Sequence, residues 1–373
     1  MKIGIDARLI GETGVGRYIR NLIRELSVLD KENQFIVFLR EGDFRTFEAP
    51  NSRWKKRIAN TRWHTFSEQI IMPWILMREH LDVLHVPYFA APIFYPRKYI
   101  LTIHDLTILH FNTGKASTLP MAMYKVRRLG YLFILTVGVR RASHILTVSH
   151  AIKNDIVTFL GVSPDKVSVT YESVDPDIVS SLGNTDQHKP IIEGRYFLYV
   201  GNVYPHKNME TFLEGYKKYV ETSSHRLPLV IVGKDDLFYR RLRGELAKMK
   251  LSNRVQILQN VNDTTLNNLY KHAQALVLPS RMEGFGLPAL EALALGSRVL
   301  CSDIPVFHEI LGDLAEYMES TDTDDISLKL ANEAVLPPLS TIAQRRIASH
   351  MERFTWKELA QKTLQTYHEV FQR

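Results

Sequence analysis

The sequence predicts an α/β protein built from two doubly wound domains that face each other across a cleft. The chain has 373 residues, of which 45% are hydrophobic and 23% charged, so two domains of ordinary size can each form a core. Short apolar strands alternate with amphipathic helices along the chain, as in parallel sheets. This alternation starts twice with a strand, a loop and a helix, at residue 1 and again at residue 195.

The first half begins with an alternating apolar strand, MKIGIDA, at residues 1–7. A loop with Gly11, Gly14 and Gly16 follows, and then a helix with apolar residues at helical spacing. Further strands are expected at 34–40, 81–87, 99–106, 144–149 and 166–175, and a basic helix at 121–142. The polar, turn-rich stretch 180–194 has no periodicity and is the best linker candidate. We therefore place the first domain at 1–183 and the linker at 184–194.

The second half repeats the pattern with strands expected at 195–201, 227–233, 254–261, 275–280, 297–303 and 314–318. Residues 340–373 read as helical, and an apolar stripe occupies one side of the last segment: Trp356, Leu359, Leu364, Tyr367 and Phe371. We place the second domain at 195–352. The final helix, 353–373, is expected to pack back on the first domain.

Charge is unevenly distributed along the chain. The net charge is +7, and residues 44–142 alone contain 15 Lys or Arg against 5 Asp or Glu, including Lys55, Lys56, Arg57, Lys125, Arg127, Arg128, Arg140 and Arg141. Such a zone favours an anionic partner, although a basic surface without a partner is equally compatible with it. Because the sequence shows no compact nucleic-acid recognition motif, we favour an anionic membrane or a pyrophosphate-linked acceptor and expect no nucleic acid.

Cysteine and hydropathy patterns indicate a cytoplasmic protein. The single cysteine, Cys301, excludes an internal disulfide framework and follows an apolar strand, where a buried, inert thiol is expected. The first strand begins at once, which leaves no room for a signal peptide. The uncharged, mostly apolar run at 129–139 is too short for a bilayer, which needs about 20 residues.

The most informative stretch is residues 278–303, LPSRMEGFGLPALEALALGSRVLCSD. An apolar strand leads into a glycine-bearing turn and then a short helix, with Pro288 suited to its first turn and Gly296 to the position just past its end. A helix start after such a turn presents free backbone N–H groups that favour a phosphate. Glu291 can accept hydrogen bonds from two neighbouring hydroxyls, as on a ribose. Glu283, in the turn, can bind sugar hydroxyls or offset positive charge on a reacting carbon.

Two further loops supply candidates. Lys207 follows the strand at 195–201 and can reach phosphate oxygens, with Asn202 and His206 as neighbouring hydrogen-bonding groups. His104 stands at the carboxyl end of a strand, the edge at which doubly wound sheets bind ligands. Because the sequence has no credible His/Cys cluster for zinc, Lys207 and backbone N–H groups are expected to meet the phosphate charge without a metal or other cofactor.

Nearly the whole chain resembles a retaining glycosyltransferase of the GT-B fold, sequence family 4 (group 1). The residues that carry the resemblance are MKIGIDARLIGETGVGRYIRNLIREL, LTIHDL, HILTVSHAIKNDIVTFLGVSPDKVSVTYESVD, YVGNVYPHKN and PSRMEGFGLPALEALALGSRVLCSDIPVFHEILGD. The last of these is highly specific, whereas the glycine loop alone is not. The overall pattern is most similar to bacterial mannosyltransferases of cell-surface polysaccharide synthesis.

The resemblance implies specific site residues. His104, Glu283 and Lys207 are expected to be catalytic, and the donor-binding residues are Gly14, Gly16, Asn202, His206, Lys207, Glu283, Phe285, Gly286, Leu287 and Glu291. Many relatives have arginine at the positions of Asn202 and His206. The expectation is therefore either one permanent cation at the diphosphate, Lys207, or a second, pH-dependent cation at His206.

The implied reaction transfers a hexose, with mannose favoured, from a nucleotide-diphosphate sugar to a glycan or lipid-linked acceptor with retention of configuration. A GDP-sugar is favoured over a UDP-sugar. The enzyme would be cytoplasmic, with peripheral contact to the inner face of the membrane. A sugar-nucleotide epimerase of the same architecture and a non-catalytic nucleotide-sugar-binding protein are the alternatives.

Overall fold

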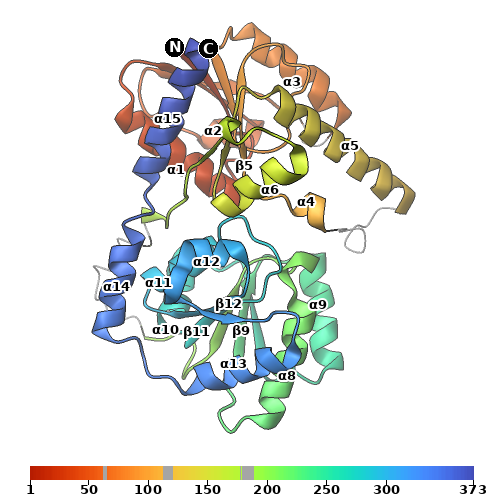
Figure 1. The fold of residues 1–373 in the computed structure, drawn as a ribbon, viewed down its shortest axis with the longest axis vertical. Helices are drawn as coiled ribbons and strands as arrows, with labels where there is room; N and C mark the ends of the chain where they lie inside the picture. Colours follow the sequence, from red (N-terminus) through yellow and green to blue (C-terminus); the bar gives the residue numbers. More distant parts are fainter. Residues whose placement is uncertain (62–64, 112–120, 177, 179–188) are drawn as a thin grey trace. The chain divides into compact units, whose positions relative to one another are not determined.

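The chain forms two compact units (Figure 1). The computed structural model describes residues 1–61, 65–111, 121–176, 178 and 189–373. The first unit comprises Met1–Glu172 and Phe354–Arg373, and the second comprises Ser173–Arg353. Residues 184–188 of the expected linker lie outside the described residues. The expectation that the two domains face each other across a cleft stays a prediction.

The first unit is built on a seven-stranded sheet in which all neighbouring strands are parallel. Its order is β3 (Trp54–Ile58), β2 (Gln34–Leu39), β1 (Lys2–Asp6), β4 (Val83–Val86), β5 (Tyr99–Ile103), β6 (His144–Thr147) and β7 (Val167–Val169). Strand β3 was not predicted from the sequence, because three of its five residues are charged. Such a composition suits the exposed edge of a sheet. The expected strand at 166–175 was too long, since β7 ends at Val169.

Helices cover both faces of this sheet. They are α1 (Gly14–Leu29), α2 (Glu41–Thr46), α3 (Phe66–Arg78), α4 (Thr107–His110), α5 (Met121–Arg141), α6 (His150–Leu160), the 3₁₀ turn η2 (Pro164–Lys166) and α15 (Trp356–Gln372). The connections from β1 to β2 and from β2 to β3 run toward the β3 edge, so right-handed crossovers place α1 and α2 on one face of the sheet. The later connections run toward β7 and place α3, α5 and α6 on the other face. Helix α1 begins at Gly14, so Gly14 and Gly16, expected in the loop, lie in the first turn of the helix.

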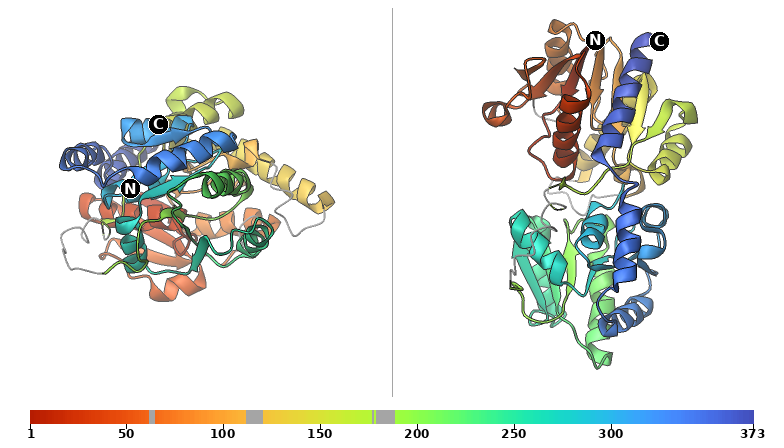
Figure 2. Two further views of the ribbon diagram at one scale, coloured as in Figure 1. Left: turned by 90° about the horizontal axis from the view of Figure 1, so that it is seen from below. Right: turned by 90° about the vertical axis from the view of Figure 1, so that its left-hand side faces the viewer.

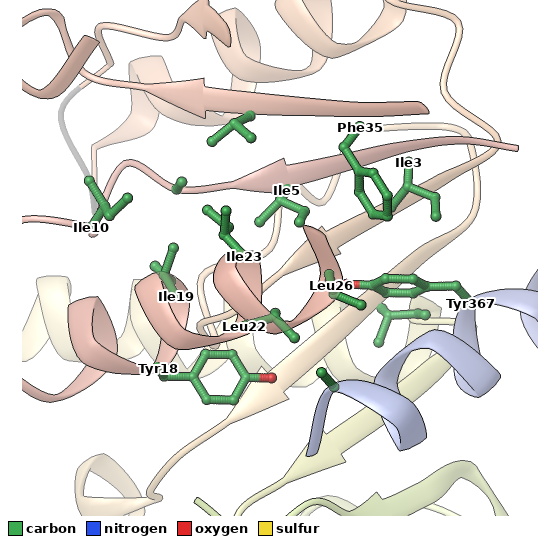
Figure 3. Close-up of a cluster of buried hydrophobic side chains, with 14 of the residues drawn as sticks. Ile3, Ile5, Ile10, Tyr18, Ile19, Leu22, Ile23, Leu26, Phe35 and Tyr367 are labelled. Carbon is green, nitrogen blue, oxygen red and sulfur yellow. The ribbon is translucent and has the colours of Figure 1, made fainter. Parts of the chain in front are cut away.

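The C-terminal helix α15 belongs to the first unit and runs beside α1 (right view of Figure 2). Trp356, Leu359 and Tyr367 are buried in the same core as Ile3 and Ile5 of β1 and Leu26 of α1. Figure 3 shows part of this core, in which Tyr367 of α15 lies near Leu26. Phe371, expected in this stripe, is instead 47% exposed, whereas the adjacent Val370 is buried, so Phe371 lies outside the buried side of the helix.

The second unit is built on a six-stranded parallel sheet of order β10 (Val255–Gln259), β9 (Leu229–Gly233), β8 (Phe197–Val200), β11 (Ala275–Leu278), β12 (Arg298–Ser302) and β13 (Glu316–Met318). Its helices are α8 (Met209–Thr222), α9 (Leu237–Lys248), α10 (Asp263–His272), α11 (Leu287–Ala294), α12 (Pro305–Leu311), α13 (Thr323–Val335) and α14 (Thr341–Met351), with the 3₁₀ turns η3 (Pro205–Lys207) and η4 (Gly312–Leu314). The predicted fold class, two doubly wound α/β units, is confirmed.

Both sheets have a point at which the strand order reverses. In the first unit the chain moves outward from β1 to β3 and returns on the other side at β4; in the second it moves from β8 to β10 and returns at β11. Doubly wound sheets bind ligands at this switch point, outside the carboxyl ends of the strands. The loops after β1 and β4, and those after β8 and β11, are therefore where functional side chains are expected.

Candidate active site

The stretch 278–303 folds as predicted into strand β11, a glycine turn and helix α11. Gly286 caps the helix with a φ of +97°, and a Cβ at this position would lie 2.8 Å from Cε1 of Phe307, so only glycine fits without strain. Pro288 lies in the first turn, as predicted. At the other end Gly296 has a φ of +83° and donates its N–H to the Leu293 carbonyl, while the Ser297 N–H reaches the Ala292 carbonyl, a Schellman ending.

The N-terminus of α11 follows directly from β11, one of the two strands at the switch point. The first N–H groups of a helix have no carbonyl partner within it, and the helix dipole adds partial positive charge there. Phe285, Gly286 and Leu287, which form this helix start, are buried. The arrangement is suited to hold a phosphate group on backbone N–H groups.

Glu291 lies one turn into α11 and is only 2% exposed. Its Oε2 accepts a hydrogen bond of 2.9 Å from the hydroxyl of Tyr270, which comes from α10 and is fully buried. Burial of a carboxylate is costly unless hydrogen bonds compensate it. The tyrosine fixes the orientation of one carboxylate oxygen, so that the group is set before any ligand binds.

Lys207 and Glu283 form an ion pair between the loops after β8 and β11. Lys207 Nζ lies 2.6 Å from Oε1 of Glu283, and their side chains are 16% and 15% exposed. The Ser280 hydroxyl donates to the same carboxylate oxygen at 2.7 Å. The turn η3 positions the lysine, with the Lys207 N–H donating to the Tyr204 carbonyl. A cation and a carboxylate that sequence analysis selected independently thus lie in direct contact.

Additional hydrogen bonds hold these two loops together. The Arg281 N–H donates to the His206 carbonyl at 2.8 Å, and Arg281 Nε donates to Oδ1 of Asn208 at 3.0 Å. Asn208 is buried, adopts a left-handed φ of +58° at the start of α8, and donates to the Ser320 carbonyl. Asn202, in contrast, is exposed. Arg281 therefore holds the two loops together through the side-chain amide of Asn208.

In the first unit, Gly14 and Gly16 occupy the first turn of α1, after β1. A Cβ at Gly16 would lie 2.6 Å from the Ile10 carbonyl oxygen, so this glycine is required by the fold of the preceding turn. A Cβ at Gly14 would meet nothing within 4 Å. The two glycines thus differ: Gly16 has an internal structural role, whereas Gly14 leaves open space at the helix start.

His104 follows β5 and is held by two acceptors. Its Nδ1 lies 3.1 Å from Oε1 of Glu172, and its Nε2 lies 3.2 Å from the Pro87 carbonyl oxygen. The Tyr18 ring contacts it edge-on, with centroids 4.8 Å apart. A carbonyl and a carboxylate both accept hydrogen bonds, so each ring nitrogen of His104 lies beside an acceptor. The two contacts therefore fix the orientation of the His104 ring.

Replacing Glu172 with Gln should lower turnover about 10- to 100-fold, since His104 loses the carboxylate that lies at its Nδ1 and holds the ring. The ring NMR signals of His104 should shift in the variant, because an amide replaces the carboxylate beside the ring. The exposed pair of His110 and Asp155, 3.2 Å apart, provides a matched control, and Asp155→Asn should leave turnover unchanged. An unchanged His104 spectrum in Glu172→Gln would show that Glu172 does not hold the ring.

His85, near the end of β4, lies in the core of the first unit and is fully buried. Its ring nitrogens lie 2.6 Å from the Tyr367 hydroxyl of α15 and 2.7 Å from Oγ1 of Thr102. Burial, together with the nearby charge of His104, lowers the pKa of His85 to about 3. It therefore stays neutral and connects the C-terminal helix to β4 and β5.

The stability of the first unit should accordingly depend on pH. The folded-state pKa of His85 lies below the unfolded value of about 6.5, so the stabilisation is complete above pH 6.5 and is lost as the pH falls, by up to about 1.4 kcal/mol per pH unit. Urea unfolding of wild type and His85→Gln between pH 7 and pH 5 tests this, with exposed His225→Gln as control. Parallel pH dependences of wild type and His85→Gln would contradict it.

Sequence analysis missed four residues that shape the site: Glu172, Asn208, Tyr270 and Ser280. Glu172 lay inside the expected strand 166–175, which hid its position; because β7 ends at Val169, it stands just beyond the strand, at the ligand-binding edge of the sheet. Across the described ranges, no group of three or more His, Cys, Asp or Glu side chains could hold a metal ion. Cys301 is buried, which raises the pKa of its thiol.

Comparison with known proteins supports an enzymatic role for these units. The family description "Glycosyltransferase Family 4" matches residues 13–178, and "Glycosyl transferases group 1" matches residues 184–332. The chain is 28% identical to the O-antigen chain mannosyltransferase RfbU of Salmonella typhimurium over 83% of this chain and 80% of that protein. It is 25% identical to the O-antigen chain mannosyltransferase B of Escherichia coli over 95% and 96%.

Solved structures show the same fold. The sucrose-phosphate synthase of Thermosynechococcus elongatus superposes with a TM-score of 0.73 at 17% identity, covering 100% of this chain and 99% of that one. WaaG, a glycosyltransferase involved in lipopolysaccharide biosynthesis, gives a TM-score of 0.72 at 14% identity over 97% and 98%. This chain belongs to the group 1, family 4 glycosyltransferases of the GT-B fold.

Proposed function

We propose that this glycosyltransferase moves mannose from GDP-mannose to a glycan or lipid-linked acceptor, with retention of anomeric configuration. The observation that supports the donor site best is the arrangement at the switch point of the second unit. There the buried Glu291 and the Lys207–Glu283 pair flank the N-terminus of α11. Each part of a nucleotide-diphosphate sugar has a chemically suited partner here: a carboxylate for its hydroxyls, and a cation with backbone N–H groups for its phosphates.

In this proposal the donor lies along α11. Glu291 accepts hydrogen bonds from the two ribose hydroxyls through its pre-oriented carboxylate. The diphosphate binds at the helix start beside Lys207, where Phe285, Gly286 and Leu287 bring the backbone close. Glu283 faces the sugar. Lys207 carries the permanent charge at the diphosphate, so the proposal assigns no role to a metal ion.

The proposed chemistry breaks the bond between sugar C1 and the phosphate oxygen, with the electron pair leaving on the diphosphate. Lys207 and the α11 N-terminus stabilise that developing negative charge. The acceptor hydroxyl oxygen forms the new bond to C1 on the same face, and its proton passes to the leaving phosphate oxygen. Glu283 and the leaving group offset the positive charge on the sugar. His104 keeps its expected catalytic role as a prediction, which the Glu172→Gln variant tests.

The sugar and acceptor are proposed from the relatives. Two are named O-antigen chain mannosyltransferases, and a third, from Xanthomonas oryzae, is named a GDP-mannose:cellobiosyl-diphosphopolyprenol alpha-mannosyltransferase, 27% identical over 56% of this chain. Those names describe mannose transfer, in one case to a lipid-diphosphate-linked sugar. Such an acceptor carries the negative charge that the basic zone of the first unit favours.

His206→Arg should tighten GDP-mannose binding about five-fold, because arginine adds a permanent cation next to Lys207. The reason for choosing this position is that the His206 carbonyl is anchored by Arg281, which fixes the backbone from which the side chain extends. Calorimetric titration of both proteins with GDP-mannose measures the change. Equal or weaker binding in the variant would mean that position 206 does not face the diphosphate.

A transfer assay tests the proposed function. Enzyme and GDP-[¹⁴C]mannose are incubated with and without lipid-diphosphate-linked glycans, and both GDP release and labelled product are measured. Transfer predicts GDP release that requires acceptor, with label in the glycan. Conversion of the sugar without acceptor would identify an epimerase, and binding without turnover across the acceptors would identify a nucleotide-sugar-binding protein.

A further inference from the structure

Helix α5 presents an unusual surface on the first unit. Met123, Val126, Leu129 and Phe133 recur at spacings of three or four residues, and each side chain is between 57% and 71% exposed. Such spacing places them on one side of a helix. The opposite, inner side is buried through Leu135, Gly138 and Val139. The first half of α5 projects from the unit in Figure 1 and in the left view of Figure 2.

Helix α3 has an apolar outer side as well. Ile70, Ile71, Trp74 and Met77 are between 45% and 61% exposed. The guanidinium of Arg78 stacks on the indole of Trp74, 3.3 Å from the ring centroid. An exposed tryptophan with a neighbouring arginine is typical of groups at the boundary between water and lipid headgroups.

The loop between β4 and β5 connects the two helices. Gln69 of α3 accepts a hydrogen bond from the Ile93 N–H, and Arg141 of α5 donates to the Ile93 and Tyr95 carbonyls. Between these anchors Phe94 is 60% exposed. The loop thus contacts both helices, and α3 and α5 cover the same face of the sheet. We call the exposed apolar residues of α3 and α5, together with Phe94, the α3–α5 face.

Charge decides which partner fits the α3–α5 face. Helix α5 carries five Lys or Arg and no Asp or Glu, and Lys125, Arg127, Arg140 and Arg141 are exposed. The acidic residue of α3, Glu68, is buried against Arg8 at 2.8 Å. Isolated exposed apolar residues are ordinary, but a large apolar patch marks an interaction site. Apolar side chains bordered by cations on a helix match an anionic lipid bilayer, which has negative headgroups above an apolar interior.

We propose that the α3–α5 face docks on an anionic lipid bilayer, with its apolar side chains inserted below the headgroups and its Lys and Arg side chains paired with lipid phosphates. Contact would be peripheral: within the described part of the chain, no helix is both long and apolar enough to cross a membrane. The inference goes beyond the sugar-transfer proposal and does not require it, because none of these residues belongs to the candidate active site.

Flotation of the full chain with phosphatidylcholine vesicles, with and without phosphatidylglycerol, tests the inference. Wild type should float with the anionic vesicles and much less with neutral ones. The triple variant Val126→Ser, Leu129→Ser, Phe133→Ser should bind at least about 100-fold more weakly, since three inserted side chains are lost. Lys125→Glu with Arg127→Glu should weaken binding by more than about five-fold per position.

Matched controls exist on the second unit. Leu328, Val335 and Ile342 are similarly exposed, and their triple Ser variant should float like wild type. Arg240→Glu with Lys248→Glu controls for net charge. Anionic vesicles should also shift the tryptophan emission to shorter wavelength in wild type but less in Trp74→Phe.

Three results would overturn the proposal: no flotation of wild type, equal flotation of the α5 variants and their controls, or a change from dimer to monomer in the triple variant, which would make the face a contact between copies of the chain. Thermal stabilisation of each variant by GDP-mannose is measured in parallel. Loss of vesicle binding with donor binding intact concerns this face alone, whereas vesicle binding without donor binding would refute the proposed function and leave the face standing.

Discussion

Lys207→Ala should lower turnover about 100- to 1000-fold, the usual loss when one group that stabilises a leaving negative charge is removed. The lysine is largely buried against Glu283, so it is already placed at the helix start before donor binds. Steady-state rates with GDP-mannose and acceptor measure the effect. Lys248→Ala, which removes an exposed ion pair with Glu245, is the matched control and should keep wild-type rates.

The ion pair allows a sharper version of this experiment. If Lys207 served only to neutralise Glu283, then removing both charges in Lys207→Ala, Glu283→Ala would restore activity relative to the single variant. If the lysine binds the diphosphate, the double variant stays as impaired as Lys207→Ala or worse. Recovery of turnover in the double variant would therefore reject the phosphate role of Lys207.

Glu291→Ala should weaken binding of GDP-mannose about 100-fold, because two hydrogen bonds from ribose hydroxyls to a charged group are lost. The loss should appear mainly in KM, since the ribose lies away from the bond that breaks. Tyr270→Phe removes only the 2.9 Å hydrogen bond that orients the carboxylate and should weaken binding about five-fold. Calorimetric titration of the three proteins measures both effects.

A donor analogue identifies which hydroxyls Glu291 binds. Wild type should bind the 2′-deoxyribose form of GDP-mannose more weakly than GDP-mannose itself, whereas Glu291→Ala should bind the two nearly alike. A variant that still discriminates between them as strongly as wild type would place the ribose elsewhere.

The fold was predictable because its signals are local. Alternating apolar strands, Pro288 at a helix start and Gly296 just past its end each follow from a few neighbouring residues, and each is present in the structure. Strand β3 escaped because edge strands need not be apolar. Phe371 was misplaced because the spacing of apolar residues does not locate the edge of the buried side, where Val370 and not Phe371 is buried.

The site was less predictable because its contacts join distant parts of the chain. Lys207 and Glu283 are separated by 76 positions, and His104 and Glu172 by 68. Sequence analysis proposed three of these four residues, but it could not pair them. His85 and His104 show the difference that burial makes: both stand near the ends of neighbouring strands, yet one is enclosed in the core and the other meets a carboxylate at the sheet edge.

The most direct test of the proposed donor site is a thermal-unfolding screen of nucleotide sugars. GDP-mannose at about 100 times its dissociation constant should stabilise wild type by about 2.7 kcal/mol, more than UDP-sugars at equal concentration, and should stabilise Glu291→Ala and Lys207→Ala far less. The proposal would be contradicted if no nucleotide sugar stabilised wild type, or if both variants were stabilised as strongly as wild type.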